Sequence, residues 1–355
     1  MTEYLYATSY ADPASANLGD TLNKYGLDGA LIWSETVYDT EGFAQTISGL
    51  AVDASGYAYI CGSFSYSAPT YTHVAKFTPA GAVAWAVKVL ENANTVECIA
   101  VCPSGNVLIG FERESIGGDY YTVALLQAAD GAVLWRADTG ADSAVYKVAS
   151  DTSNNCYAAG NEGTDTYSAW AFEDDGTPIW TDEGGLDNHT LAAVVYGSYL
   201  HVDAAYLGVP ATMRLALADG VENTDLWPIL LILAFDRFGR GYGLLQFGAS
   251  SLVYQLPATL ASVPEWNTAW TDADSPLSLA VSPDGYVFVC ARLADTGDGI
   301  IRCYDAETGV EQGGNWPVST VGYCDRVATT PGVYGAFPSA WLPAPHIYVG
   351  NVRYE

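Results

Sequence analysis

The sequence predicts an all-β protein built from one repeated four-stranded unit, and three observations carry this prediction. A block ending in tryptophan recurs along the whole chain, and a second apolar block with a tight turn recurs between the tryptophans. No helix-length segment has apolar residues at i, i+3, i+4 and i+7, whereas stretches such as Tyr57–Ile60 alternate with the two-residue period of a strand. Internal repetition of this kind indicates a repeat architecture.

The tryptophan block predicts a β-hairpin at the end of each unit. KYGLDGALIWSETV (24–37) recurs as KFTPAGAVAWAVKV (76–89), LLQAADGAVLWRAD (125–138) and AFEDDGTPIWTDEG (171–184), with further copies at 215–228 and 303–317 and a degraded copy at 254–270. The seven marker residues, separated by 39 to 52 residues, are Trp33, Trp85, Trp135, Trp180, Trp227, Trp266 and Trp316.

The second block predicts a hairpin at the start of each unit. ISGLAVDASGYAYICGSF (47–64) is matched by residues 96–112, 145–161 and 276–293. Their turns DASG, CPSG, TSNN and SPDG contain the Gly, Asn, Asp and Ser that tolerate positive φ or hydrogen-bond their own backbone. Each period thus holds four short strands, which is the content of one propeller blade.

These units predict a single β-propeller domain over residues 1–355, with about seven four-stranded blades. The chain starts in phase with the second strand of a blade, and CDRVATT (324–330) resembles the missing first strand. Strands from both termini are therefore expected to close the ring, which leaves no open sheet edge there. GVYGAFPSAW and HIYVGNVRYE follow this strand, so an eighth, composite blade stays open as the alternative.

The blocks LDGALIW, AADGAVLW and EDDGTPIW resemble the blade signature of PQQ-like propeller repeats, and YTHVAKFTPAGAVAW is similar to the bacterial repeats called SBBP. The resemblance covers most of the chain and concerns architecture. It implies that each tryptophan docks between neighbouring blades, as a large apolar ring recurring once per period also suggests. The inter-blade set is Trp33, Trp85, Trp135, Trp180, Trp227 and Trp316. Quinoprotein dehydrogenases carry a vicinal cysteine pair, but no two of the seven cysteines here are adjacent.

Composition argues against several classes of protein. The 355 residues include 13 Lys and Arg against 41 Asp and Glu, so the net charge of −28 repels phosphate and argues against a nucleic-acid partner. Half of the residues are hydrophobic, which excludes general disorder. The first twenty residues lack a basic and then apolar segment, so no secretory signal is expected. The longest apolar run, 226–235, is half of what a membrane helix needs and is interpreted as a buried strand pair.

No motif identifies a reaction, so we predict a non-enzyme with no catalytic, cofactor-binding or metal-binding residues. His73, His189, His201 and His346 have no metal-site spacing, and no GxSxG or DxDxDG motif occurs. SPDGYVFV differs from the sialidase Asp box because Val289 replaces its tryptophan. Cys98 and Cys102 lie four residues apart and are interpreted as packed thiols, and all seven cysteines are expected to be buried and free.

One repeated feature lies outside the predicted core. Three segments between the second and third strands (65–72, 114–122 and 162–168) end in Tyr followed by Thr or Ser. The candidate surface-binding residues are Tyr71, Tyr121 and Tyr167. Tyrosine at a loop tip supplies a large amphipathic contact at low entropic cost, and sugar stacking is one use of it. The alternative is that these tyrosines cap the rim of each blade.

The function expected from these features is a non-catalytic structural or attachment component on the surface of a virus particle, specifically a bacteriophage, made in the host cytoplasm. Its partners are other proteins of the assembly, with a cell-surface glycan as a second candidate, and neither nucleic acid nor membrane insertion is expected. An intracellular bacterial propeller in the cytoplasm, acting as a protein interaction platform, is the first alternative. A carbohydrate-binding or glycoside-acting propeller is the second.

Overall fold

The computed structural model describes most of the chain as β-strands and the turns that join them. The described residues are 3–9, 20–37, 46–64, 71–91, 96–116, 119–140, 143–162, 166–186, 192–206, 209–228, 232–235, 240–247, 250–256, 266–270, 275–293, 298–320 and 324–329. No helix occurs in this part of the chain. The predicted all-β class is confirmed.

The strands form antiparallel sheets in which chain neighbours pair in order. Five sheets have four strands each, and a sixth has eight. The first four-stranded sheet has the order β28 (Cys324–Thr329), β1 (Tyr4–Ser9), β2 (Thr21–Gly26), β3 (Leu31–Thr36). The next has β4 (Thr46–Val52), β5 (Ala58–Phe64), β6 (Tyr71–Phe77) and β7 (Val83–Glu91).

The eight-stranded sheet joins two sets of four strands. The first set is β8 (Val96–Val101), β9 (Val107–Ile116), β10 (Asp119–Leu126) and β11 (Val133–Ala137), and the second is β12 (Ser143–Ser150), β13 (Cys156–Glu162), β14 (Thr166–Phe172) and β15 (Pro178–Leu186). The long strand β9 connects the sets because it also pairs with β12 at Glu112 and Ala144.

The remaining three sheets repeat the same order. They are β16 (Ala192–Tyr196), β17 (Tyr199–Tyr206), β18 (Val209–Ala216), β19 (Glu222–Pro228); β20 (Ile232–Phe235), β21 (Gly241–Phe247), β22 (Ser250–Leu256), β23 (Trp266–Trp270); and β24 (Ser275–Val281), β25 (Tyr286–Arg292), β26 (Gly299–Asp305), β27 (Val318–Thr320). The apolar run 226–235 is divided between β19 and β20, so its two strands belong to neighbouring sheets and do not pair with each other.

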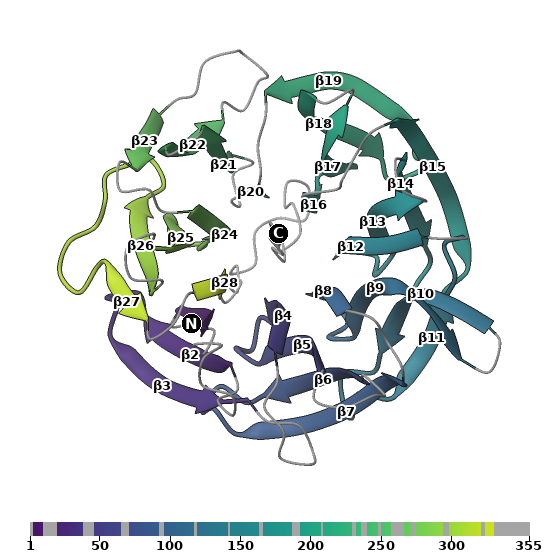
Figure 1. Cartoon of the computed structure of the whole chain (residues 1–355), viewed down its shortest axis with the longest axis horizontal. Coiled ribbons are helices and arrows are strands. Elements are labelled where there is room, and N and C mark those ends of the chain that lie inside the picture. Colours follow the sequence, from purple (N-terminus) through teal and green to yellow (C-terminus); the bar gives the residue numbers. More distant parts are fainter. Residues whose placement is uncertain are drawn as a thin grey trace, which may run out of the picture.

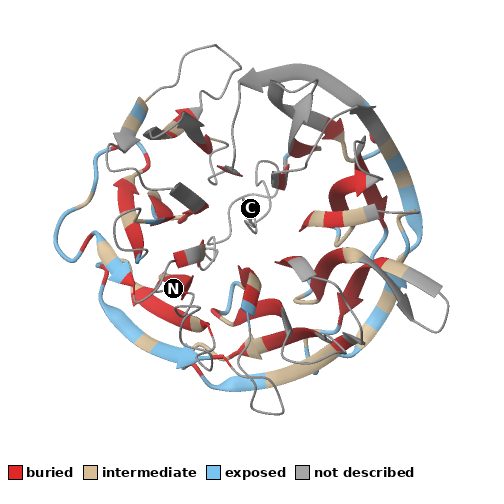
Figure 2. Ribbon diagram, viewed as in Figure 1, coloured by how far each residue is buried: buried red, intermediate tan, exposed pale blue. Residues whose placement is uncertain are grey.

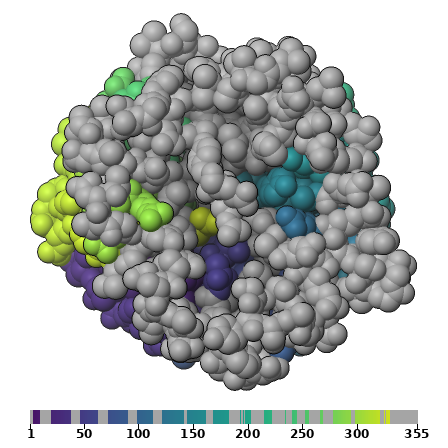
Figure 3. Space-filling view, viewed as in Figure 1, coloured from purple at the N-terminus to yellow at the C-terminus, as the bar shows by residue number. Residues whose placement is uncertain are grey.

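The sheets stand around a common centre in a propeller-like arrangement (Figure 1). The first strand of each set lies nearest the centre, and the last strand lies at the periphery, where Figure 2 shows most of the exposed residues. In the space-filling view, described residues from the beginning, the middle and the end of the chain lie around the middle of one face (Figure 3).

The two ends of the described chain meet in one sheet. Strand β28 pairs antiparallel with β1, with Ala7 opposite Val327. Arg326 on β28 donates its Nε–H to the carbonyl oxygen of Ser48 on β4, at 2.9 Å, and so links this sheet to the next. The pairing of segment 324–330 with the amino-terminal strands, expected from the sequence, is present over Cys324–Thr329. The segments GVYGAFPSAW and HIYVGNVRYE lie outside the described residues.

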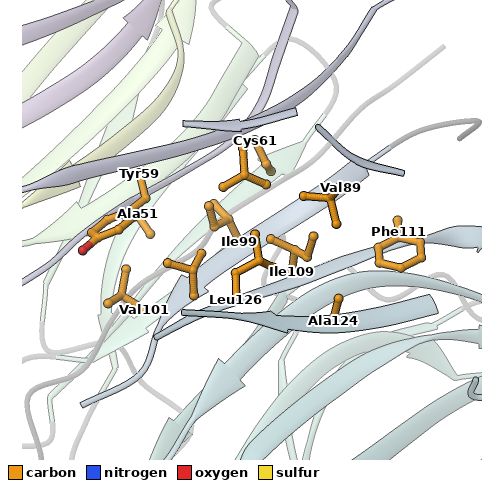
Figure 4. Packing of buried hydrophobic residues seen from close by; sticks show 12 residues of the cluster. Ala51, Tyr59, Cys61, Val89, Ile99, Val101, Ile109, Phe111, Ala124 and Leu126 are labelled. Carbon is orange, nitrogen blue, oxygen red and sulfur yellow. The ribbon is translucent and has the colours of Figure 1, made fainter. Parts of the chain in front are cut away.

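The hydrophobic core lies between the faces of adjacent sheets. In one cluster Ala51 and Tyr59 of one sheet pack against Ile99 and Ile109 of the next (Figure 4). Strands buried on both faces explain why segments such as 98–101 and 107–111 are continuously apolar. The seven cysteines are buried and free, as the sequence predicted. Among the described residues, no helix is long and apolar enough to cross a membrane.

Candidate interaction surface

Six of the marker tryptophans connect one four-stranded set to the next through a hydrogen bond. Each indole N–H donates to a backbone carbonyl oxygen in the turn between the last two strands of the neighbouring set. The pairs are Trp33 with Pro79 (3.1 Å), Trp85 with Ala128 (3.1 Å), Trp135 with Asp174 (2.8 Å), Trp180 with Leu217 (2.9 Å), Trp266 with Ala306 (3.1 Å) and Trp316 with Leu27 (3.0 Å). Trp227 lies on β19, and its side chain is outside the description.

The rings of these tryptophans also pack across the seams between sheets. Trp316 is buried, whereas Trp33, Trp85, Trp135, Trp180 and Trp266 are half-buried. Glycines of the neighbouring turns lie against the indole faces. At Gly131, which has a φ of +76°, a Cβ atom would come within 2.9 Å of Trp85. A positive φ and the lack of a side chain are both required there. The tryptophans are therefore structural and contribute little exposed surface for binding.

Two lysines are used inside these seams. The ammonium group of Lys24 donates to Pro79 O at 2.8 Å and lies 3.7 Å from the ring centroid of Tyr4. In the next sheet Lys76 donates to Ala128 O at 3.0 Å and lies 4.5 Å from the ring centroid of Tyr57. Burial lowers the pKa of Lys24. None of the four lysines of the chain is exposed, so they hardly offset the carboxylates of the surface.

The candidate binding tyrosines lie in strands and not at loop tips, so that part of the sequence interpretation is wrong. Tyr71 is the first residue of β6, opposite Phe64, and Tyr167 lies on β14 opposite Asn161. Tyr121 lies on β10; it is half-buried, packs against a core cluster and has the Arg136 guanidinium 5.8 Å from its ring centroid. The strands are longer than their apolar segments, because the polar residues at their ends also pair with the neighbouring strand. The three tyrosines come from different four-stranded sets.

A feature that the sequence interpretation missed is a series of exposed apolar side chains beside the outer strands. They follow the glycine turn before the outermost strand by one to three residues and are 37 to 61% exposed. We call this set the outer rim; its members are Leu31, Ile32, Val83, Leu134, Ile179, Val221 and Val310. The signal was present in the apolar residues that follow the glycine turn before the tryptophans, but the sequence does not show which of these residues are exposed.

Exposed carboxylates surround the outer rim. They lie in the same turns and outer strands, at Asp28, Glu35, Asp130, Asp138, Asp175, Asp219, Glu307 and Glu311. Arg302 faces Glu311 at 3.4 Å and neutralises one of them. The outer rim therefore combines exposed apolar side chains with nearby carboxylates.

The residues considered for catalysis do not form a reactive cluster among the described parts of the chain. His73 on β6 and His201 on β17 are buried in different sheets. His189 and His346 lie outside the described residues. Within the described residues no group of three or more His, Cys, Asp or Glu could hold a metal ion.

Buried tyrosines form hydrogen bonds with the aspartates of two equivalent turns. The hydroxyl of Tyr59 donates to Asp53 and that of Tyr157 donates to Asp151, each at 3.0 Å. Each aspartate also accepts a backbone N–H within its own turn. Burial, with the negative aspartate as a further cause, raises the pKa of both tyrosines far above the ordinary value. These pairs stabilise the turns and leave no hydroxyl ready for chemistry.

The chain is similar to solved structures in fold alone. No family model and no curated protein matches the sequence. A protein from Lactobacillus plantarum matches with a TM-score of 0.64 and 13% identity, over 93% of this chain and 99% of that chain. The periplasmic gluconolactonase PpgL of Pseudomonas aeruginosa matches with a TM-score of 0.63 and 11% identity, over 92% and 99%. Both neighbours are propeller-like, which agrees with the arrangement of sheets described above.

Proposed function

We propose that this chain is a closed seven-bladed propeller of the PQQ-like or SBBP type that acts without catalysis, as a surface-exposed structural or attachment component of a bacteriophage particle. The observation that carries the functional part is the outer rim, where large apolar side chains are exposed among carboxylates. The exposed apolar side chains lie in six of the seven sets and provide apolar contact points, and burying one Val or Leu side chain against a partner contributes about 1.5–3 kcal/mol.

Three features support seven blades and closure. The strands divide into seven sets of four, counting the eight-stranded sheet as two sets. Strand β28 completes the sheet of β1, β2 and β3. Trp316, from the last set, donates to Leu27 of the first set, in the same way that the other tryptophans reach their neighbours. An eight-bladed ring would need a further set of strands from residues outside the description.

The distribution of charge supports a protein partner and an outward position. The net charge of −28 keeps separate copies soluble and weakens contact with packaged nucleic acid. Lys24 and Lys76 are bonded inside the seams, and most charged residues that are exposed in the described part of the chain are Asp or Glu. The proposed partner is therefore another protein of the particle whose docking face combines apolar and basic side chains, while a cell-surface glycan remains the second candidate ligand.

Mass spectrometry of purified particles alongside the lysate tests the assignment. We expect the protein at a constant copy number in the particles. Absence from particles, with no turnover by the recombinant protein, would favour the cytoplasmic interaction platform. Absence together with hydrolysis of a glucono-lactone or a glycoside would favour an enzyme. The gluconolactonase neighbour makes lactone hydrolysis the first reaction to assay.

Paired variants on one strand test the role of the outer rim. Val83→Ser removes an exposed apolar side chain from β7, and Ala84→Ser changes the adjacent exposed residue by one oxygen atom. If the rim binds a partner, Val83→Ser combined with Leu134→Ser lowers affinity by tenfold or more, because burying one Val or Leu side chain contributes about 1.5–3 kcal/mol and tenfold in affinity is about 1.4 kcal/mol. Ala84→Ser binds as the unmodified protein does. Equal binding by all variants would remove the rim from the proposal.

A further inference from the structure

Strand β7 (Val83–Glu91) is the outermost strand of its sheet. It pairs with β6 on one side, and no strand in the described part of the chain pairs with its other side. Figure 1 shows β7 at the periphery of the molecule. An edge strand presents a row of backbone N–H and C=O groups that can pair with a strand of another chain.

The other outer strands carry features that hinder such pairing, and β7 has fewer of them. Strands β11, β23 and β27 are short, with five, five and three residues. Strands β3, β15 and β19 contain Glu or Asp, and β15 and β19 also contain Pro. Strand β7 has nine residues without Pro or Gly, and its charged residues are Lys88 and Glu91. Short length, charge and Pro are means by which proteins protect edge strands from pairing.

The part of β7 that suits a second strand is residues 83–88. The carbonyl oxygen of Val89 accepts a hydrogen bond from the guanidinium of Arg136 at 3.3 Å, so the neighbouring set already occupies the end of the strand. Register with β6 is unbroken over residues 85–88, and no bulge distorts this stretch. The first two residues of β7 are exposed, and the next four are half-buried. This segment, VAWAVK, is apolar up to its last residue.

The charge of β7 favours a second copy of this chain as the partner. The net charge of −28 makes two copies repel wherever their carboxylates meet. The sequence of β7 contains one Lys and one Glu and has no net charge, and charges more than about 8 Å away are largely screened at physiological ionic strength. A second β7 offers the same apolar and neutral edge, and its Trp and Val side chains form favourable pairs across antiparallel strands.

We propose that two copies of this chain form a dimer in which β7 of one copy pairs antiparallel with β7 of the other, so that two four-stranded sheets become one continuous sheet. A twofold axis uses the same edge on both molecules. Association stops at two copies, because the remaining outer strands of the described chain are short or carry carboxylates. The inference does not depend on the proposed function, because it concerns the free protein.

Sedimentation velocity of the full-length recombinant protein measures this association. We expect the mass to rise from 37.7 kDa to twice that value as the protein concentration increases. The exposed Asp130 adjoins Gly131, which lies against Val87, so carboxylates of the two copies come near each other beside the paired edges. The dimer should therefore be tighter in about 0.5 M NaCl than in about 0.05 M NaCl. A basic protein bound through the carboxylates would show the opposite dependence on salt.

Matched variants distinguish β7 from the other outer strands. Ala84→Asp places a carboxylate on the proposed edge, and Ser34→Asp does so at an exposed position of β3. Ala84→Asp should raise the dissociation constant of the dimer by about tenfold or more, because it enters the interface twice and opposes like charges, whereas Ser34→Asp should leave it unchanged. Circular dichroism verifies that both variants fold.

Hydrogen exchange of the unmodified protein at low and high concentration locates the interface and decides the matter if a variant does not fold. Amides of residues 83–88 should gain protection in the dimer. A monomer under all conditions, a dimer that weakens as salt is added, equal effects of the two variants, or protection confined to other segments would each overturn the proposal.

Discussion

Alanine at Gly131 probes the packing of a tryptophan against the turn of the neighbouring sheet. Gly131 has a φ of +76°, and a Cβ atom there would lie 2.9 Å from Cε3 and Cζ3 of Trp85 and 3.0 Å from Val87. Gly105 lies in the same four-stranded set with a φ of +86°, but its nearest contact would be Ala128 at 3.4 Å, an ordinary van der Waals distance. Gly105→Ala is therefore a matched control for the backbone conformation.

The two substitutions should differ in their effect on the free energy of unfolding, because only Gly131→Ala displaces the indole of Trp85. A left-handed backbone costs an alanine about 1–2 kcal/mol relative to glycine, and both variants incur this cost. Gly131→Ala additionally forces Trp85 away from the turn, which strains packing by about 1–3 kcal/mol and weakens its hydrogen bond to Ala128 O. We expect Gly131→Ala to lower the free energy of unfolding by about 1–3 kcal/mol more than Gly105→Ala does.

Urea unfolding followed by circular dichroism measures both variants, and a third measurement isolates the contact. In a Trp85→Ala background only the contact with Val87 remains, so Gly131→Ala should lose most of its extra cost relative to Gly105→Ala. Equal destabilisation by the two alanines in the unmodified protein, within about 0.5 kcal/mol, would refute the packing described here.

Three further predictions concern the seams and the buried polar groups. Trp85→Ala should cost about 3 kcal/mol in urea unfolding, at the lower end of the range for a large aromatic residue because the ring is only half-buried, and Trp85→Phe about 1 kcal/mol through the lost hydrogen bond. Arg326→Met should lower the free energy of unfolding by about 1–2 kcal/mol because it removes the hydrogen bond to Ser48. Arg302→Met loses a partly exposed ion pair and should lower it by less than about 0.5 kcal/mol. Equal effects of the two substitutions would contradict the role of β28 in linking the two sheets. Burial raises the pKa of four tyrosines well above 10, so the native state retains protons that the unfolded chain loses, and stability should fall as pH rises above about 10. These residues are Tyr6, Tyr25, Tyr59 and Tyr157. Lys24 has a lowered pKa and therefore makes stability rise with pH, but it is one group against four tyrosines. A urea midpoint that stays constant from pH 8 to 11 would contradict the prediction.

Most of the strand framework was predictable because its signals are local. The turns at 53–56, 78–81 and 102–105 are rich in Asp, Ser, Pro and Gly, which favour tight turns, and the tryptophans mark the period. Pairing of segment 324–330 with the first sheet also followed from the phase of the repeat at the chain start. Repetition makes such long-range pairing readable from one sequence, since every unit shows what the incomplete one lacks.

The candidate surface was less predictable because exposure depends on packing between units. The Tyr–Thr pattern was read as a loop tip, but Tyr121 lies on a strand that extends past the apolar core and packs beside Arg136. Conversely, Leu31 and Val83 belong to apolar segments that resemble core strands, yet they are exposed because the outermost strand has no neighbour on its far side.

Hydrogen exchange of the free protein, compared with the protein bound in its assembly, tests the central claim most directly. The outer strands are paired on one side only, so many of their amides exchange readily unless a partner covers them. If the outer rim is the docking surface, amides of residues 31–36, 83–91, 133–137 and 178–186 gain protection on assembly, while the strands nearest the centre stay unchanged. Protection gained around the centre, with unchanged exchange along the outer strands, would contradict the account.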